Sequence, residues 1–439
     1  MLKFTFMALG LVIGLFGLDY YVYRNWRRFA EYRRWARRTL PFYRVFMALM
    51  PFVLPVYLYV SRWWEVDPKF ARAVIIGVWA VYYVPKAVIA LGILVKDLSR
   101  FVVWLFGWFQ EQLLPSAPVV AAPAESASPE AEAVAAPPEP ALDLSDMKRV
   151  PRREFLQRMG WSAAAVPFVI VGYGVFRTLY DFMLSRVEVT VAGLPRALDG
   201  LTIAQISDLH AGSFFSPQPM REAVALLNEL RPDLIAVTGD FVNGDAAELP
   251  MILPALRELR ADLGVFGCLG NHDHYAHTPD VVAAVRSTTV DLLVNERRTF
   301  EIDGARLHLL GTDNTGFYQR HADLPAALDG LPPDDDEAAY VLLAHDPTYW
   351  DTHVRPNHPE IDLMLCGHTH GGQLGIEAGP VRWSFARVVY PRWAGLYAED
   401  RPEGGRQFLY VNRGLGTVGP PLRLGIRPEI TLLTLRRAA

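Results

Sequence analysis

Five short clusters of aspartate, asparagine and histidine lie between residues 208 and 370, and each follows an apolar run typical of a buried strand. They are Asp208-Leu209-His210, Gly239-Asp240, Gly270-Asn271-His272-Asp273, Ala344-His345-Asp346 and Gly367-His368-Thr369-His370. Oxygen ligands mixed with imidazole nitrogens, without a thiolate, are suited to Mn, Fe, Zn or Co. The order and residue types of the clusters therefore predict a metal-dependent hydrolase.

The spacing within the clusters suits a pair of cations. Asp208 and His210 are two positions apart, so at a strand end both side chains can point to the same side and bind one metal. His368 and His370 form a second such pair, and Asp240 is placed to bridge, because one carboxylate can offer an oxygen to each of two metals. The predicted metal ligands are Asp208, His210, Asp240, Asn271, His345, His368 and His370.

The segments around these clusters alternate between strand-like and helix-like patterns. Strands are predicted at residues 201–207, 234–237, 265–269, 299–302, 306–311, 340–344, 363–366 and 408–412, and helices at 219–230, 250–259 and 279–288. This alternation predicts an α/β domain with a mainly parallel sheet and helices on its faces. Sites in such sheets form in loops at the carboxyl ends of strands, which is where each cluster lies.

The ordered set Asp-x-His, Gly-Asp, Gly-Asn-His-Asp, His and Gly-His-x-His resembles the signature of the calcineurin-like metallophosphoesterase superfamily. The tail Asn412-Arg413-Gly414-Leu415-Gly416, followed by residues 426–430, resembles the membrane-attached bacterial YkuE/YaeI-like branch. The resemblance covers roughly residues 185–435. It implies a fold of central β-sheets flanked by helices and an enzyme that hydrolyses phosphate mono- or diesters.

The resemblance also implies roles for the site residues, around two divalent metal ions. The first metal would be held by Asp208, His210, Asp240 and His370, and the second by Asp240, Asn271, His345 and His368. His272 would protonate the leaving oxygen or stabilise the transition state, with Asp273 orienting it. Arg413 has two interpretations: a phosphate clamp, by its fork geometry, or a residue that braces its loop.

Three functions follow, and the first is preferred because the ligand set is complete and His272 is present. It is the hydrolysis of phosphate esters by attack of a metal-bridging hydroxide. The second is hydrolysis of a lipid-linked pyrophosphate or nucleotide-sugar lipid, since anchoring places a site near amphiphiles. The third, from another class, is a non-catalytic metal-binding scaffold.

Residues 1–114 have a different composition and predict a membrane region with about three transmembrane helices. Apolar runs at residues 2–21 and 71–95 are long enough to cross a bilayer, the run at 45–60 spans if it recruits its flanks, and 101–109 predicts a short interfacial helix. The arginine-dense stretch from Arg24 to Arg44 predicts a cytoplasmic loop. Its position beside a span argues against nucleic-acid binding.

Residues 115–147 are rich in Ala, Pro and Glu, which predicts a disordered linker. In residues 148–184, Arg152 and Arg153 precede an apolar segment at 161–182, which predicts a fourth span. The arginine pair either resembles a twin-arginine export signal, with the export machinery as a partner, or simply flanks the helix. Both interpretations predict a multi-pass plasma-membrane protein whose catalytic domain, residues 185–439, is periplasmic or extracytoplasmic. Only two cysteines occur, so no disulfide framework is expected.

Overall fold

The computed structural model describes residues 2–31, 33–63, 69–113, 152–177, 180–316, 321–332, 335–378, 381–401, 404–419 and 421–438. The chain divides into two units, one formed by Met1–Pro51 and Tyr83–Phe168 and the other by Phe52–Tyr82 and Val169–Ala439. The linker predicted at residues 115–147 and the side chains of Arg152 and Arg153 lie outside the described residues.

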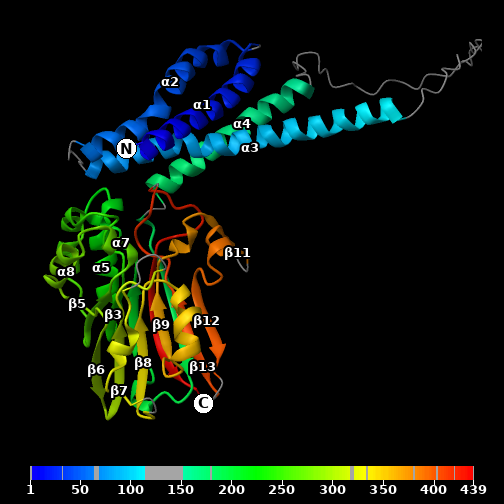
Figure 1. Cartoon of the computed structure of the whole chain (residues 1–439). Helices are drawn as coiled ribbons and strands as arrows, with labels where there is room; N and C mark the ends of the chain where they lie inside the picture. Colours follow the sequence, from blue (N-terminus) through cyan, green and yellow to red (C-terminus); the bar gives the residue numbers. More distant parts are fainter. Residues whose placement is uncertain are drawn as a thin grey trace, which may run out of the picture. The chain divides into compact units, whose positions relative to one another are not determined.

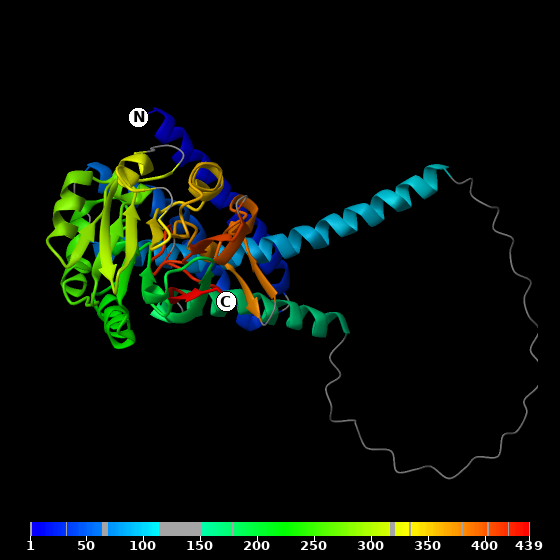
Figure 2. The ribbon, with the colours of Figure 1, turned by 90° about the horizontal axis from the view of Figure 1, so that it is seen from below.

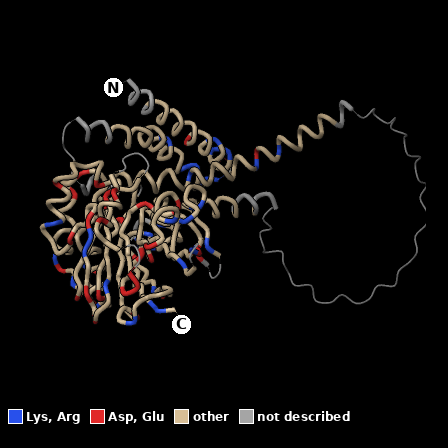
Figure 3. The backbone as a smooth tube through the Cα atoms, turned by 60° about the horizontal axis from the view of Figure 1, so that its bottom comes forward, with Lys and Arg blue, Asp and Glu red and all other residues tan. Residues whose placement is uncertain are grey.

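Four helices make up the N-terminal part of the chain: α1 (Leu2–Ala30), α2 (Arg34–Trp63), α3 (Lys69–Leu113) and α4 (Arg152–Phe176) (Figure 1). Within the described residues, the stretches Arg34–Tyr57 and Ile75–Phe109 are long and apolar enough to cross a membrane, and Met159–Gly174 is a shorter apolar stretch. Figure 3 draws the lysines and arginines in blue. Where α1 ends and α2 begins, the sequence contains Arg24, Arg27, Arg28, Arg33, Arg34, Arg37 and Arg38. The number of spans remains a prediction.

Residues 101–109 do not form a separate interfacial helix, as the sequence had indicated. They continue α3, which runs for 45 residues without interruption. A helix of that length measures ~68 Å at 1.5 Å per residue, more than twice the ~30 Å of a hydrocarbon core. The polar turn from Lys96 to Arg100 does not end the helix, because lysine and arginine are good helix formers and no proline lies within that turn.

Helices α1 and α3 are joined by a buried ion pair. Lys86 in α3 bonds to the carboxylate of Asp19 in α1, and the Tyr83 hydroxyl donates a hydrogen bond to the same carboxylate at 3.0 Å. Further along both helices, the Lys96 ammonium donates to Asn25 at 3.2 Å. Because the contact partners advance together along the two sequences, α1 and α3 run parallel.

Replacing Lys86 with methionine is expected to destabilise this helix pair. Asp19 is 0% exposed, so the substitution leaves a buried carboxylate without its cation, which typically costs about 3–5 kcal/mol. We expect a lower midpoint of thermal unfolding for the full chain in detergent, and partial recovery in the double variant Asp19→Asn/Lys86→Met. Arg100→Met, at an exposed position of the same helix, is the control. An unchanged midpoint for Lys86→Met would contradict the assignment.

The second unit contains the strands of the protein. They are β1 (Met183–Val191), β2 (Thr202–Ile206), β3 (Leu234–Thr238), β4 (Gly264–Cys268), β5 (Val290–Leu292), β6 (Glu296–Ile302), β7 (Ala305–Gly311), β8 (Ala338–Leu343), β9 (Leu363–Cys366), β10 (Gly375–Ala378), β11 (Val381–Ser384), β12 (Gly395–Asp400), β13 (Arg406–Val411) and β14 (Glu429–Arg437). The helices are α5 (Gln218–Leu230), α6 (Leu253–Leu256), α7 (Asn271–Tyr275), α8 (Thr278–Arg286), α9 (Leu324–Leu328), α10 (Arg355–Asn357) and α11 (Ala386–Val389).

Twelve of these strands form two mixed sheets (Figures 1 and 2), which confirms the predicted fold of central β-sheets flanked by helices. The strand pattern by itself had predicted a mainly parallel sheet and did not reveal that there are two. The first sheet has the order β1-β14-β2-β3-β4-β5, with β14 antiparallel to β2. The second has the order β12-β13-β9-β8-β7-β6, with antiparallel pairs at both edges. The other neighbouring strands are parallel.

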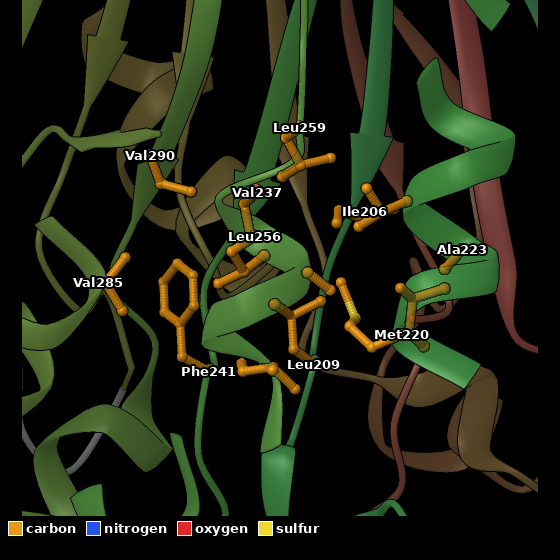
Figure 4. Packing of buried hydrophobic residues seen from close by; sticks show 14 of the residues in the cluster. Ile206, Leu209, Met220, Ala223, Val237, Phe241, Leu256, Leu259, Val285 and Val290 are labelled. Carbon is orange, nitrogen blue, oxygen red and sulfur yellow. The ribbon is translucent and has the colours of Figure 1, made fainter. Parts of the chain in front are cut away.

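The two sheets pack face to face, and helices cover their outer faces. Successive residues of a strand point to opposite faces, and in β3 Leu234 joins the core between the sheets while Ile235 joins the core beneath the helices. Figure 4 shows this outer core, in which Met220 of α5 and Val285 of α8 lie over the first sheet. Trp350 belongs to the corresponding core outside the second sheet. The order of layers is helix, sheet, sheet, helix.

Candidate metal centre

Each predicted ligand cluster follows the carboxyl end of a strand. Asp208 and His210 follow β2, Asp240 follows β3 and Asn271 follows β4, so the first sheet supplies one part of the set. The second sheet supplies His345 after β8, and His368 and His370 after β9. The site therefore lies at the edge where the carboxyl ends of these strands of the two packed sheets meet.

The backbone of these loops is strained. Asp208, His210, Asp240, His368 and His370 all have positive φ angles, of 49°, 43°, 56°, 72° and 52°. Residues other than glycine rarely adopt this region. Such strain persists only where surrounding structure imposes it, and it is concentrated at functional sites.

The first group of ligand atoms comprises Asp208, His210 and His370. The two histidines present their Nε2 atoms to each other at 3.1 Å, and His370 Nε2 lies 3.3 Å from Asp208 Oδ1. A cation between the two ring nitrogens and the carboxylate would be bound by all three of these atoms. Gly367 permits the close approach, since a Cβ there would overlap Ser207 and Asp208.

The second group comprises Asp240, His345 and His368. Asp240 Oδ2 lies 3.0 Å from His345 Nε2 and 3.5 Å from His210 Nε2, so this carboxylate faces an imidazole of each group. Asn271 contributes a buried Oδ1 that has no hydrogen-bond partner among the described residues. An unpaired buried oxygen is costly, and a cation would remove the cost. The donor set thus fits divalent metal ions.

Backbone carbonyls determine which ring nitrogen of His210 and of His345 faces the other ligand atoms. His210 Nδ1 lies 3.1 Å from the Val242 oxygen, and His345 Nδ1 lies 2.7 Å from the Thr238 oxygen. A carbonyl can only accept, so each Nδ1 carries the proton and donates it. Such contacts orient metal-binding imidazoles in proteins, and here they turn Nε2 toward the carboxylates.

Burial and charge act differently on the histidines. Burial lowers the pKa of His210 to about 3, although Asp240 opposes this, and it also lowers the pKa values of His368 and His370. For His345 burial acts in the same direction, but the charge and hydrogen bond of Asp240, together with the charge of Asp208, outweigh it and raise the pKa to about 10. Three of the four imidazoles are therefore in the neutral form that binds metals.

Metal affinity is expected to rise with pH. Below about pH 10 the metal-free His345 ring holds a proton that a cation must displace, because a ligand nitrogen binds only when deprotonated. One released proton corresponds to about tenfold tighter binding per pH unit. Calorimetric titration with Zn²⁺ at pH 6.5, 7.5 and 8.5 would measure this, and an affinity independent of pH over that range would contradict it.

His272 lies beside both groups. Its ring centroid is 4.7 Å from that of His210, its Nδ1 donates to the Asn243 carbonyl at 2.6 Å, and its backbone N–H donates to Asp240 at 2.8 Å. A cavity of about 200 Å³ adjoins it, lined by Gly212, Asn243 and Thr417 among others. The contact of Nδ1 with a carbonyl leaves Nε2 free to act on a bound molecule.

The resemblance implied that Asp273 orients His272. In the structure, the Asp273 carboxylate contacts backbone N–H groups and not the His272 ring. This carboxylate accepts backbone N–H bonds from Asp240 at 3.0 Å, Phe241 at 2.8 Å and Gly270 at 2.9 Å. Burial, followed by the charge of Asp240, raises its pKa to about 7. Asp273 therefore ties the loop that carries Asp240 to the loop that carries Asn271.

Arg413 is enclosed by acids. Its guanidinium lies 2.8 Å from Glu377 and 3.7 Å from Glu429, and the side chain is 6% exposed. Glu377 contacts both terminal nitrogens of the guanidinium, and Glu429 lies within ion-pair distance of Nε, so the geometry favours the bracing role over the phosphate clamp.

Two contact residues were not found from the sequence. Asn243 acts through its backbone oxygen, which no side-chain pattern reveals, and Tyr390 follows α11 far from any cluster. The Tyr390 hydroxyl lies 2.9 Å from His368 Nε2. Tyr390 is one of four aromatic residues between the last histidine cluster and β12, so the sequence does not single it out.

A two-sheet sandwich with buried carboxylates and imidazoles at its strand ends defines the class of metallophosphoesterases. Residues 3–179 match the family described as "Probable Calcineurin-like phosphoesterase, transmembrane domain", and residues 201–372 match "Calcineurin-like phosphoesterase". The chain belongs to the calcineurin-like phosphoesterase family, is a phosphoester hydrolase and is located at a membrane. The membrane-attached branch indicated by the sequence is confirmed.

Three relatives illustrate the match. The chain is 31% identical over 297 residues to "Uncharacterized metallophosphoesterase YkuE" of Bacillus subtilis, covering 66% of this chain and 99% of that protein. It is 31% identical over 291 residues to "Phosphodiesterase YaeI" of Escherichia coli, covering 65% and 99%. It is 33% identical over 290 residues to the bovine "Transmembrane protein with metallophosphoesterase domain", covering 63% and 62%.

Proposed function

We propose that this protein is a membrane-anchored phosphodiesterase that uses two divalent metal ions. The observation that carries the proposal is the position of Asp240, whose carboxylate faces His210 of one ligand group and His345 of the other. The first metal would be bound by Asp208, His210, Asp240 and His370, and the second by Asp240, Asn271, His345 and His368. Mn, Fe, Zn and Co all suit these ligands.

Bound cations of this kind supply Lewis-acid charge and lower the pKa of water. The chain itself supplies the remaining parts. His272 is oriented by the Asn243 carbonyl, which accepts from Nδ1. In its doubly protonated form the ring would donate the proton of Nε2 to the leaving oxygen of the ester. Asp273 would hold the two ligand loops together, and Arg413 would brace the loop after β13.

The substrate class proposed is a phosphodiester. The relative YaeI is named a phosphodiesterase, and the cavity of about 200 Å³ beside His272 gives a second ester group room on that side of the site. A lipid-linked pyrophosphate would also meet an anchored site, and it is included in the test below.

The domain from residue 185 onward is proposed to face the periplasm or cell exterior. The arginines that end α1 and begin α2 favour a cytoplasmic position for that connection. The parallel arrangement of α1 and α3 is consistent with α2 crossing in between, and α4 would then lead outward.

The test is hydrolysis by the full chain in detergent, stripped of metal and then titrated with Mn²⁺, Zn²⁺ or Fe²⁺. Bis(p-nitrophenyl) phosphate, p-nitrophenyl phosphate and a polyprenyl pyrophosphate are the three probes. We expect metal-dependent turnover that is highest on the diester. Metal binding without turnover on any probe would favour a scaffold, and preference for the pyrophosphate would replace the proposed substrate class.

A further inference from the structure

A cavity of about 720 Å³ lies within the first unit, among α1, α3 and α4. Its volume falls within the roughly 300–1,000 Å³ of small-molecule sites. Gly92 of α3 and Gly160 of α4 line it, and an added Cβ at either position would meet no described atom within 4 Å. The cavity belongs to the helices and is not part of the metal centre.

One end of the cavity is basic. Arg28, Lys96 and Arg100 line it together with Asn25, and Glu31 is the one acid among the lining residues, which gives a net charge of +2. Arg28 and Arg100 make no ion pair within the described part of the chain, whereas Lys96 contacts Asn25 at 3.2 Å and Asp97 at 3.3 Å. The guanidinium groups of Arg28 and Arg100 can therefore pair with an anion in the cavity.

The opposite end is apolar. Val88, Ile89 and Ile93 of α3 line it, and Pro167 of α4 does so from across the cavity. Val88 precedes Lys96 by eight positions, or ~12 Å along the helix. Beside the basic end, the ring of Trp161 in α4 packs against the ring of Trp26 in α1, with the ring centroids 4.6 Å apart. The cavity therefore changes from basic to apolar along the helix axes.

We propose that this cavity binds one anionic phospholipid of the bilayer. Its phosphate would lie against Arg28, Lys96 and Arg100, and the first part of an acyl chain would lie along Val88 and Ile93. Basic recesses between membrane helices favour such anionic headgroups. A free phosphate would use the basic end alone and leave the apolar wall uncovered, so the amphiphile fits better. The proposal relies on the membrane placement of these helices.

Native mass spectrometry of the full chain, released from nanodiscs of equal parts phosphatidylglycerol and phosphatidylcholine, tests this. Gly92→Phe places a ring in the cavity, and Gly107→Phe is the matched control: it lies on the same helix, its Cβ also meets no described atom, and it does not line the cavity. Arg28→Gln/Lys96→Gln/Arg100→Gln removes the charge, and Arg24→Gln, outside the cavity, is the control for charge. Size-exclusion profiles identify any variant that does not fold.

We expect the wild type to retain phosphatidylglycerol in preference to phosphatidylcholine, and both Gly92→Phe and the triple variant to reduce that retention roughly tenfold or more. The two controls should match the wild type. Equal retention of both lipids, or full retention by folded Gly92→Phe, would overturn the proposal. Displacement of the lipid by millimolar inorganic phosphate would show a phosphate site instead, and a chain found in the soluble fraction would show that the membrane placement had failed.

Discussion

The variant Asp240→Asn is expected to lose both its metal ions and its turnover. The carboxylate faces His345 at 3.0 Å and His210 at 3.5 Å, so its charge is shared between the two ligand groups. Asparagine keeps the shape, and its oxygen can still accept the backbone N–H of His272, but it removes the negative charge. Losing about 4 kcal/mol of transition-state stabilisation lowers the rate constant by about 10³-fold.

Metal content by mass spectrometry and turnover on bis(p-nitrophenyl) phosphate should be measured on the same preparation. Asp280→Asn is a suitable control, because that carboxylate is 67% exposed and lies on α8 away from the ligand groups. If Asp240→Asn kept its metal and full activity, Asp240 would not be a bridging ligand.

The ligand clusters could be recognised from the sequence because each depends on a short local pattern. A buried strand followed at once by Asp, Asn or His predicts a side chain at the strand's carboxyl end, and no knowledge of strand order is needed. Contacts made by backbone atoms leave no such pattern. The carbonyls of Thr238, Val242 and Asn243 orient three histidines, yet any residue type could supply them.

The contacts of the Asp273 side chain were also not predictable from the sequence, because its partners are backbone N–H groups. The resemblance implied that Asp273 orients His272, but Asn271 begins the short helix α7, and the side chain at the third position turns back to the N-terminal backbone. A carboxylate there accepts orphan N–H groups at a helix start. Neighbours in sequence at a helix start therefore need not touch.

The number of sheets was not readable for a related reason. Strands of β-sandwiches that are also covered by helices are buried on both faces and lack the alternation of polar and apolar residues. In β8, Val341 faces the other sheet and Leu342 faces the outer core, yet the two residues are equally apolar. Nothing in such a run tells which sheet a strand joins. The antiparallel entry of β14 beside β2 is likewise a property of the assembled fold.

The variant His272→Ala is expected to bind metal normally and turn over roughly 10²–10⁴-fold more slowly. His272 lies beside the ligand groups, and its Nδ1 is occupied by the Asn243 carbonyl, so its free Nε2 is the atom that can meet an ester oxygen. Retained metal separates this variant from Asp240→Asn. His277→Ala, at a side chain that is 71% exposed, is the control.

The leaving group decides which role His272 has. p-Nitrophenolate is stable without a proton, whereas an alkoxide is not, so a proton donor matters far more for a methyl than for a p-nitrophenyl ester. If His272 protonates the leaving oxygen, the loss in His272→Ala should be roughly tenfold or more larger on the alkyl diester. An equal loss on both esters would mean that the imidazole stabilises charge on the phosphoryl oxygens, because that charge is present whichever group leaves. No loss on either ester would remove His272 from the catalytic residues.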